Sequence, residues 1–210
     1  GKVEQLVLVN CCDSMRRVYD IVESTGKCKF LYMLDMPHED NDCEKVKLAQ
    51  GIHRLKKAYE KFSGKTFDRS GFLNAFSHEP VDNQPYIGVL GVRVSGILEK
   101  MIRDNIRMDV ENLTCTGGRR LAVIREELEK MEDDAMFLAY ADALLSQMPC
   151  FRMNNSTRRN RLYLDPNLKG IIYHTIKFCD YYGFEYASIK RDIKVPLLKI
   201  ETDFTSQSAG

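Results

Sequence analysis

Short apolar runs of strand length alternate with segments of helical periodicity in both halves of the chain. In the first half, the runs at 6–9 and 30–34 flank a stretch, Ser14–Ser24, whose apolar residues recur at helical spacing. In the second half, strand-like runs at 86–91, 108–110, 171–173 and 197–201 alternate with helical patterns at 95–105, 122–130, 133–147 and near 184–192. Such alternation is typical of parallel strands joined by crossover helices, so the sequence predicts an α/β fold with parallel sheets.

A polar segment that contains two prolines, His78–Pro85, separates the two halves. Before it, apolar spacing predicts a long amphipathic helix over about 42–62, whose lysines and glutamates we assign to solvent. We therefore predict a partial first α/β domain with a long helix over 1–80, and a second α/β domain over 84–210. The outermost predicted strands lie close to the two ends, so we expect the sequence to be a fragment of a longer protein.

The charge balance and hydropathy bound the possible partners. Lys and Arg number 31 and Asp and Glu number 30, for a net charge of +1, which gives no reason to expect nucleic acid or an anionic membrane. No apolar run approaches the roughly 18 residues that span a bilayer, and no N-terminal signal pattern is present. We expect a cytoplasmic protein with no nucleic-acid and no membrane partner.

The seven cysteines are irregularly spaced and include no C-x-x-C motif, which argues against a disulfide framework or a zinc ribbon. Two of them are placed alike: Cys12 follows the 6–9 run, Cys179 follows the 171–173 run, and an aspartate comes next in both cases. Open α/β sheets bind ligands at the carboxyl ends of their strands. We predict one site shared by Cys12 and Cys179, with thiolates suited to an iron–sulfur cluster. Cys11 is a weaker candidate, and two ordinary buried cysteines are the alternative.

Two polar loops are candidates for binding an anion. Gly117 and Gly118 precede Arg119 in a loop whose N–H groups and guanidinium suit a phosphate or carboxylate, although the spacing matches no Walker or dinucleotide motif. Arg158 lies in a second basic loop, for which simple solvation is the alternative.

His174 follows the predicted strand 171–173 and precedes Cys179 by a few residues. A single histidine is most often structural, but its place near the cysteine suggests a catalytic role as proton donor or acceptor.

Several of these segments together resemble one family. Gly170–Tyr182 and Ile193–Phe204 are similar to the C-terminal part of the 2-hydroxyacyl-CoA dehydratase and benzoyl-CoA reductase family, of the 2-hydroxyglutaryl-CoA dehydratase D-component type, and Asn10–Asp20 resembles its central Cys-Asp motif. The segments at 62–65, 86–91 and 148–150 are also similar and occur in the same order. The resemblance spans nearly the whole chain.

The resemblance implies two Rossmann/flavodoxin-like domains, the first incomplete, and a [4Fe–4S] cluster held by three cysteines of one subunit. Cys12 and Cys179 would be the second and third ligands. The family's first ligand belongs to a region that precedes this sequence, and its C-terminal helix also lies beyond it, so we expect the fragment to be inactive alone.

The implied activity is that of a lyase of anaerobic metabolism, which removes water from a 2-hydroxyacyl-CoA by reductive radical chemistry. An ATP-dependent iron–sulfur activator protein would deliver one electron, the thioester carbonyl would become a ketyl radical anion, and this radical would expel the hydroxyl group. A second homologous subunit would complete the enzyme, and the glycine loop with Arg119 and Arg158 would contact the CoA thioester. The alternatives are a benzoyl-CoA reductase-like or double-cluster reductase subunit, a non-catalytic redox or scaffold subunit, and an α/β domain with incidental cysteines.

Overall fold

The computed structural model describes residues 3–75, 84–114, 125–146, 164–177 and 179–203. The chain forms two compact units, each described by itself below. The first unit consists of 1–78 together with 121–147, and the second consists of 79–120 together with 148–210.

The first unit opens with a β-α-β motif. Strands β1 (Gln5–Val9) and β2 (Phe30–Leu34) pair in parallel, and α1 (Asp13–Thr25) connects them. Gly26 ends α1 in the left-handed conformation, with φ of 59°, which glycine adopts without the steric penalty of a side chain. The parallel pair predicted from the sequence is confirmed, and within the described residues this sheet has two strands.

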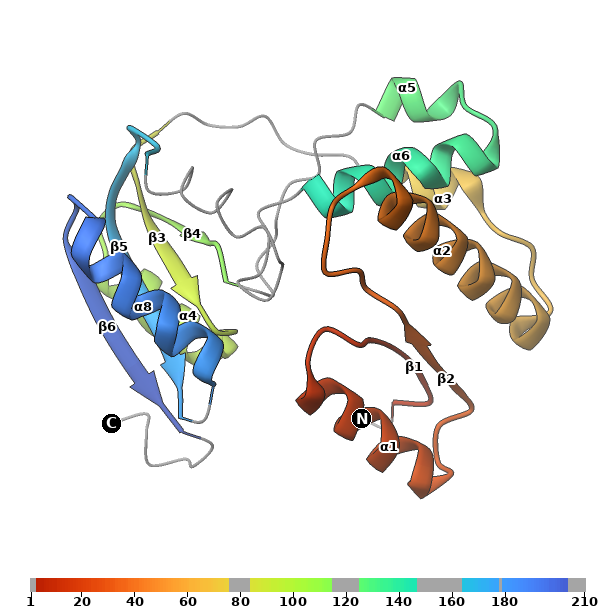
Figure 1. Ribbon diagram of the computed structural model, residues 1–210, viewed down its shortest axis with the longest axis horizontal. Coiled ribbons are helices and arrows are strands. Elements are labelled where there is room, and N and C mark those ends of the chain that lie inside the picture. The colour runs from red at the N-terminus through yellow and green to blue at the C-terminus, as the bar shows by residue number, and fades with distance from the viewer. Residues whose placement is uncertain (1–2, 76–83, 115–124, 147–163, 178, 204–210) are drawn as a thin grey trace. The chain divides into compact units, whose positions relative to one another are not determined.

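Four further helices of the first unit lie within its described residues: α2 (Asp42–Ser63), α3 (Arg69–Asn74), α5 (Arg125–Glu129) and α6 (Asp133–Ser146). Helix α2 begins where the Asn41 side chain accepts a hydrogen bond from the Glu44 N–H, and it packs along α6 (Figure 1). Helices α5 and α6 therefore group with the first unit, whereas the sequence placed their residues in a second domain over 84–210. Their contacts explain the difference: α6 buries apolar side chains on α2, and a Lys45–Asp142 ion pair of 2.8 Å joins the two helices.

The second unit is a four-stranded parallel sheet in the order β4-β3-β5-β6. In the described part of this unit the strands are β4 (Asp109–Asn112), β3 (Tyr86–Gly91), β5 (Leu168–Ile176) and β6 (Leu197–Thr202), and the helices are α4 (Gly96–Asn105) and α8 (Asp180–Asp192). Tyr182 and Ile189 of α8 pack on one face of the sheet, and Ile102 of α4 packs on the other (Figure 1). The α/β class with parallel sheets is thus confirmed.

Strand β5 is longer than predicted: it runs from Leu168 to Ile176 rather than over 171–173. It pairs with β3 at Leu168 and over Gly170–His174, and with β6 over Ile171–Ile176. These ladder hydrogen bonds extend the strand through two polar residues, His174 and Thr175, which periodicity alone would exclude. His174 consequently lies inside the strand and not after it.

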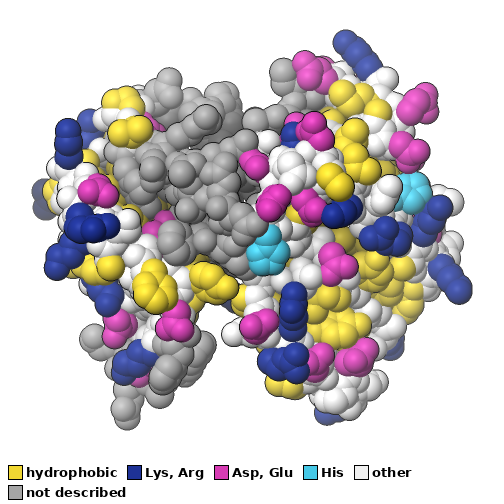
Figure 2. Space-filling view, in the orientation of Figure 1, with side chains coloured by type: hydrophobic (Ala, Val, Ile, Leu, Met, Phe, Trp, Pro, Cys, Tyr) yellow, Lys and Arg dark blue, Asp and Glu magenta, His cyan; other side chains and the backbone are white. Residues whose placement is uncertain are grey.

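Charged side chains of both signs are interspersed over the described residues on the face shown in Figure 2, in keeping with nearly equal totals of 31 and 30. Among the residues that the structure describes, no helix has the length and apolar character needed to cross a membrane.

Candidate functional site

Cys12 lies at the junction between β1 and α1. It is the N-cap residue of α1, and its carbonyl accepts hydrogen bonds from the N–H groups of Met15 and Arg16, at 3.1 and 3.2 Å. Its side chain is partly buried and forms no capping hydrogen bond. The thiol therefore lies beside the N-terminus of a helix.

Cys179 occupies the equivalent position in the second unit, as the N-cap residue of α8. Its N–H donates to the Ile176 carbonyl at 3.0 Å, and its own carbonyl accepts from the Gly183 N–H at 3.3 Å. The side chain is partly buried against the core cluster beneath α8. The sequence placed the helix near 184–192, whereas it begins at Asp180, directly after the cysteine.

Both cysteines thus follow a parallel strand and begin a helix, and sulfur donors of this kind suit an iron–sulfur cluster. Because one lies in each unit, their sharing of one site stays a prediction. Within the described ranges no three His, Cys, Asp or Glu side chains gather in a group able to hold a metal ion. The described residues therefore offer two candidate thiolates, one for each unit.

His174 is buried in the second unit and is 2% exposed. Its Nδ1 lies 3.1 Å from the Val92 carbonyl oxygen, and its Nε2 lies 2.9 Å from Thr202 Oγ1. A carbonyl oxygen only accepts, so Nδ1 donates, and in the neutral ring Nε2 accepts the Thr202 hydroxyl. His174 therefore links the carboxyl ends of β3, β5 and β6. This geometry favours a positioning role, and the catalytic role inferred from the sequence stays a prediction.

Replacing His174 with glutamine tests these two roles. We expect the free energy of unfolding to fall by about 1–2 kcal/mol, because the shorter amide cannot satisfy both Val92 and Thr202. Urea denaturation measures this loss. His53→Gln is the control, because its imidazole is only partly buried and pairs at 3.5 Å with Asp134, whose side chain is exposed. A His174→Gln protein of unchanged stability that has lost turnover would instead support proton transfer.

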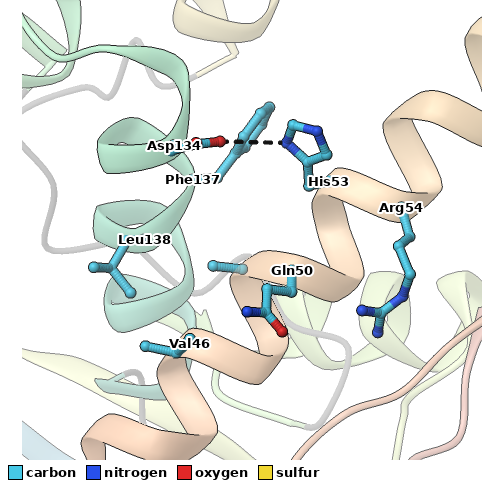
Figure 3. A pocket seen from close by; sticks show the side chains of 8 residues that line it. Val46, Gln50, His53, Arg54, Asp134, Phe137 and Leu138 are labelled. Carbon is cyan, nitrogen blue, oxygen red and sulfur yellow. Dashed lines mark ion pairs between the residues drawn. The ribbon is translucent and has the colours of Figure 1, made fainter.

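A pocket of about 500 Å³ lies between α2 and α6 in the first unit. Figure 3 shows His53 reaching across to Asp134 beside the ring of Phe137, whereas Arg54 extends from the side of α2 that faces away from α6. Apolar residues (Val46, Phe137 and Leu138) and polar residues (Gln50 and His53) line the pocket together, and such a mixture is common in ligand sites. This pocket was not predicted, because the lysines and glutamates of α2 indicated a helix face exposed to solvent.

Comparison with known families gives one match. Residues 78–210 match the model of the family described as 2-hydroxyglutaryl-CoA dehydratase, D-component. The chain belongs to this family. A search of curated proteins gave no match.

The dehydratase match includes Cys179, β5 and α8 but begins after Cys12. The family match therefore includes Cys179 itself. Cys12 lies outside the match, and its candidacy as a ligand depends on the resemblance of its segment to the family's Cys-Asp motif and on its equivalent position. Membership of the D-component family indicates a dehydratase-type subunit that works together with other components.

Four predicted substrate-binding residues, Gly117, Gly118, Arg119 and Arg158, lie outside the described residues. Their proposed contacts with CoA stay predictions.

Asn10, which the sequence did not single out, precedes the two adjacent cysteines and hydrogen-bonds to the loop after β2. No local pattern reveals this role, since Asp35 and Met36 lie 25 and 26 residues away in the chain.

Proposed function

We propose that this chain is part of an iron–sulfur 2-hydroxyacyl-CoA dehydratase subunit, with Cys12 and Cys179 as two of the ligands of a [4Fe–4S] cluster. The observation that carries the proposal is the placement of Cys179 between β5 and α8, inside the region that matches the family. Cys12 has the same placement between β1 and α1.

The residues of this chain would hold the cluster and restrict its surroundings. Each sulfur would lie at the N-terminus of a helix, and partial burial would limit the access of water to it. When bound, the cluster would supply the low-potential electron for reductive removal of water from the thioester. His174 would hold in place the edge of the sheet that leads to Cys179.

The proposal includes three partners: a CoA-thioester substrate, a second homologous dehydratase subunit and an ATP-dependent iron–sulfur activator protein. Gly117, Gly118, Arg119 and Arg158 are the proposed contacts for the substrate, because backbone N–H groups and guanidinium groups bind phosphates. The proposed location is the cytoplasm.

Anaerobic reconstitution of the full-length protein with iron and sulfide tests the cluster assignment. We expect Cys12→Ser and Cys179→Ser each to lower bound iron at least about tenfold, because a ligand is at least as important as the groups that orient it. Iron content and the broad visible absorbance of the cluster are the measurements. Cys43→Ser is the matched control, because Cys43 is exposed on the first turn of α2.

Equal iron content in all three variants would rule out Cys12 and Cys179 as ligands of the cluster. If the cluster forms, turnover of a 2-hydroxyacyl-CoA in the presence of the homologous subunit, the activator and ATP separates a dehydratase subunit from a redox or scaffold subunit. Reduction of an aromatic CoA thioester without loss of water would support a reductase instead.

A further inference from the structure

Asn10 joins the ends of β1 and β2. Its backbone N–H donates to the Leu34 carbonyl at 3.2 Å, which continues the strand pairing one residue beyond β1. Its side chain bonds twice to the next segment: Nδ2 donates to Asp35 Oδ1 at 2.6 Å, and Oδ1 accepts from the Met36 N–H at 2.7 Å. An amide is suited to this place because it presents a donor and an acceptor side by side.

These bonds fix the backbone two residues before Cys12. Little else in the described part of α1 does so, because no residue of that helix is buried and its N-cap cysteine forms no side-chain capping bond. A helix with so little packing derives little stability from the core and is expected to open easily. Asn10 therefore anchors the backbone that leads to Cys12 from the strand side.

We propose that Asn10 is a positioning residue for the Cys12 thiolate. It holds the β1–α1 junction against the loop that follows β2, so that the sulfur stays in the orientation in which it binds iron. This inference rests on the proposed function, because it assigns Asn10 a purpose at the same cluster. Groups that orient a metal ligand typically change metal affinity by about 10- to 100-fold.

The test compares three variants in the full-length protein. Asn10→Ala removes both side-chain bonds. Asp35→Ala removes only the acceptor of Nδ2 and leaves the bond to Met36, so it is the milder change if Asn10→Ala folds poorly. Asp35→Asn is the matched control, because its amide oxygen can still accept from Nδ2.

Two measurements are made on each variant: the rate at which reconstituted iron is lost to a chelator, and amide hydrogen exchange in the metal-free protein. We expect Asn10→Ala to release iron about tenfold faster and to exchange faster at Met15 and Arg16, whose N–H groups bond to Cys12. Asp35→Ala should also speed iron release and amide exchange, but by smaller factors than Asn10→Ala. Asp35→Asn should resemble the unmodified protein.

Unchanged iron release in Asn10→Ala, while Cys12→Ser loses its iron, would overturn the positioning role and leave the cluster assignment intact. Faster exchange at the junction without faster iron release would also overturn it, since Asn10 would then order the backbone without affecting the ligand. If Cys12→Ser keeps its iron, the proposed function fails at this cysteine and the role of Asn10 falls with it.

Discussion

Replacing Gly91 with alanine should disrupt the second unit more than the same change at Gly88 or Gly170, the other described glycines of its sheet. Gly91 ends β3 opposite His174 of β5, with φ of 94°. A Cβ atom here would overlap the carbonyl oxygen of His174 and lie 3.0 Å from its carbonyl carbon. That carbonyl is backbone and already accepts the Val92 N–H at 2.9 Å, so relief requires the two strands to separate. We expect a loss of more than about 3 kcal/mol, since overlap and backbone strain add.

Amide hydrogen exchange of β3 and β5 in the intact chain measures this loss, because it reports the stability of each segment separately. Gly91→Asn separates the two causes: asparagine tolerates positive φ, so an equal loss assigns the effect to the Cβ overlap. Gly96→Ala is the control, because Gly96 begins α4 and nothing lies within 4 Å of its added Cβ. Exchange that is as slow in Gly91→Ala as in Gly96→Ala would contradict the expected clash.

The alternation of strands and helices could be predicted from the sequence because each element carries its own periodicity. Strand β3 has the predicted bounds, 86–91, and β2 has the predicted bounds, 30–34. Both are short apolar runs that end at a glycine or a polar residue. The placement of Cys12 and Cys179 after strands could be predicted for the same reason, but the helix that begins directly after Cys179 could not, because its apolar periodicity is weak before residue 184.

Contacts between distant segments could not be predicted in this way. His174 was placed after its strand because a polar residue usually ends an apolar run, but ladder bonds from β6 keep it inside. Its partners, Val92 and Thr202, lie 82 and 28 residues away. The grouping of α5 and α6 with the first unit depends on side chains that meet across about 60 residues, of which Arg69 is the clearest case.

Replacing Arg69 with alanine should release α5 and the start of α6 from the first unit. Its guanidinium donates to the Leu128 carbonyl at 2.9 Å and to the Met131 carbonyl, and it pairs with Asp133 at 2.6 Å. These partners are the end of α5, the connecting turn and the first residue of α6. The planar group with several donors reaches all of them at once. We expect Arg69→Ala to cost about 2–3 kcal/mol, because a bond to a charged group is worth about 1.5–3 kcal/mol and the vacated carbonyls are only partly open to water.

Urea denaturation and amide exchange of α5 and α6 measure the effect. Arg69→Lys should recover only a minor part of the lost stability, because an ammonium is a point charge that cannot bond to the carbonyls and to Asp133 at the same time. Arg17→Ala is the matched control: its 2.9 Å pair with Asp20 is exposed, with 74% and 53% of the two side chains accessible, and such pairs contribute at most about 1 kcal/mol. Full recovery by lysine would show that charge pairing with Asp133 alone holds these helices, and the carbonyl bonds would then be incidental. Exchange in α5 and α6 that is unchanged in Arg69→Ala would instead assign their attachment to the apolar contact of α6 with α2.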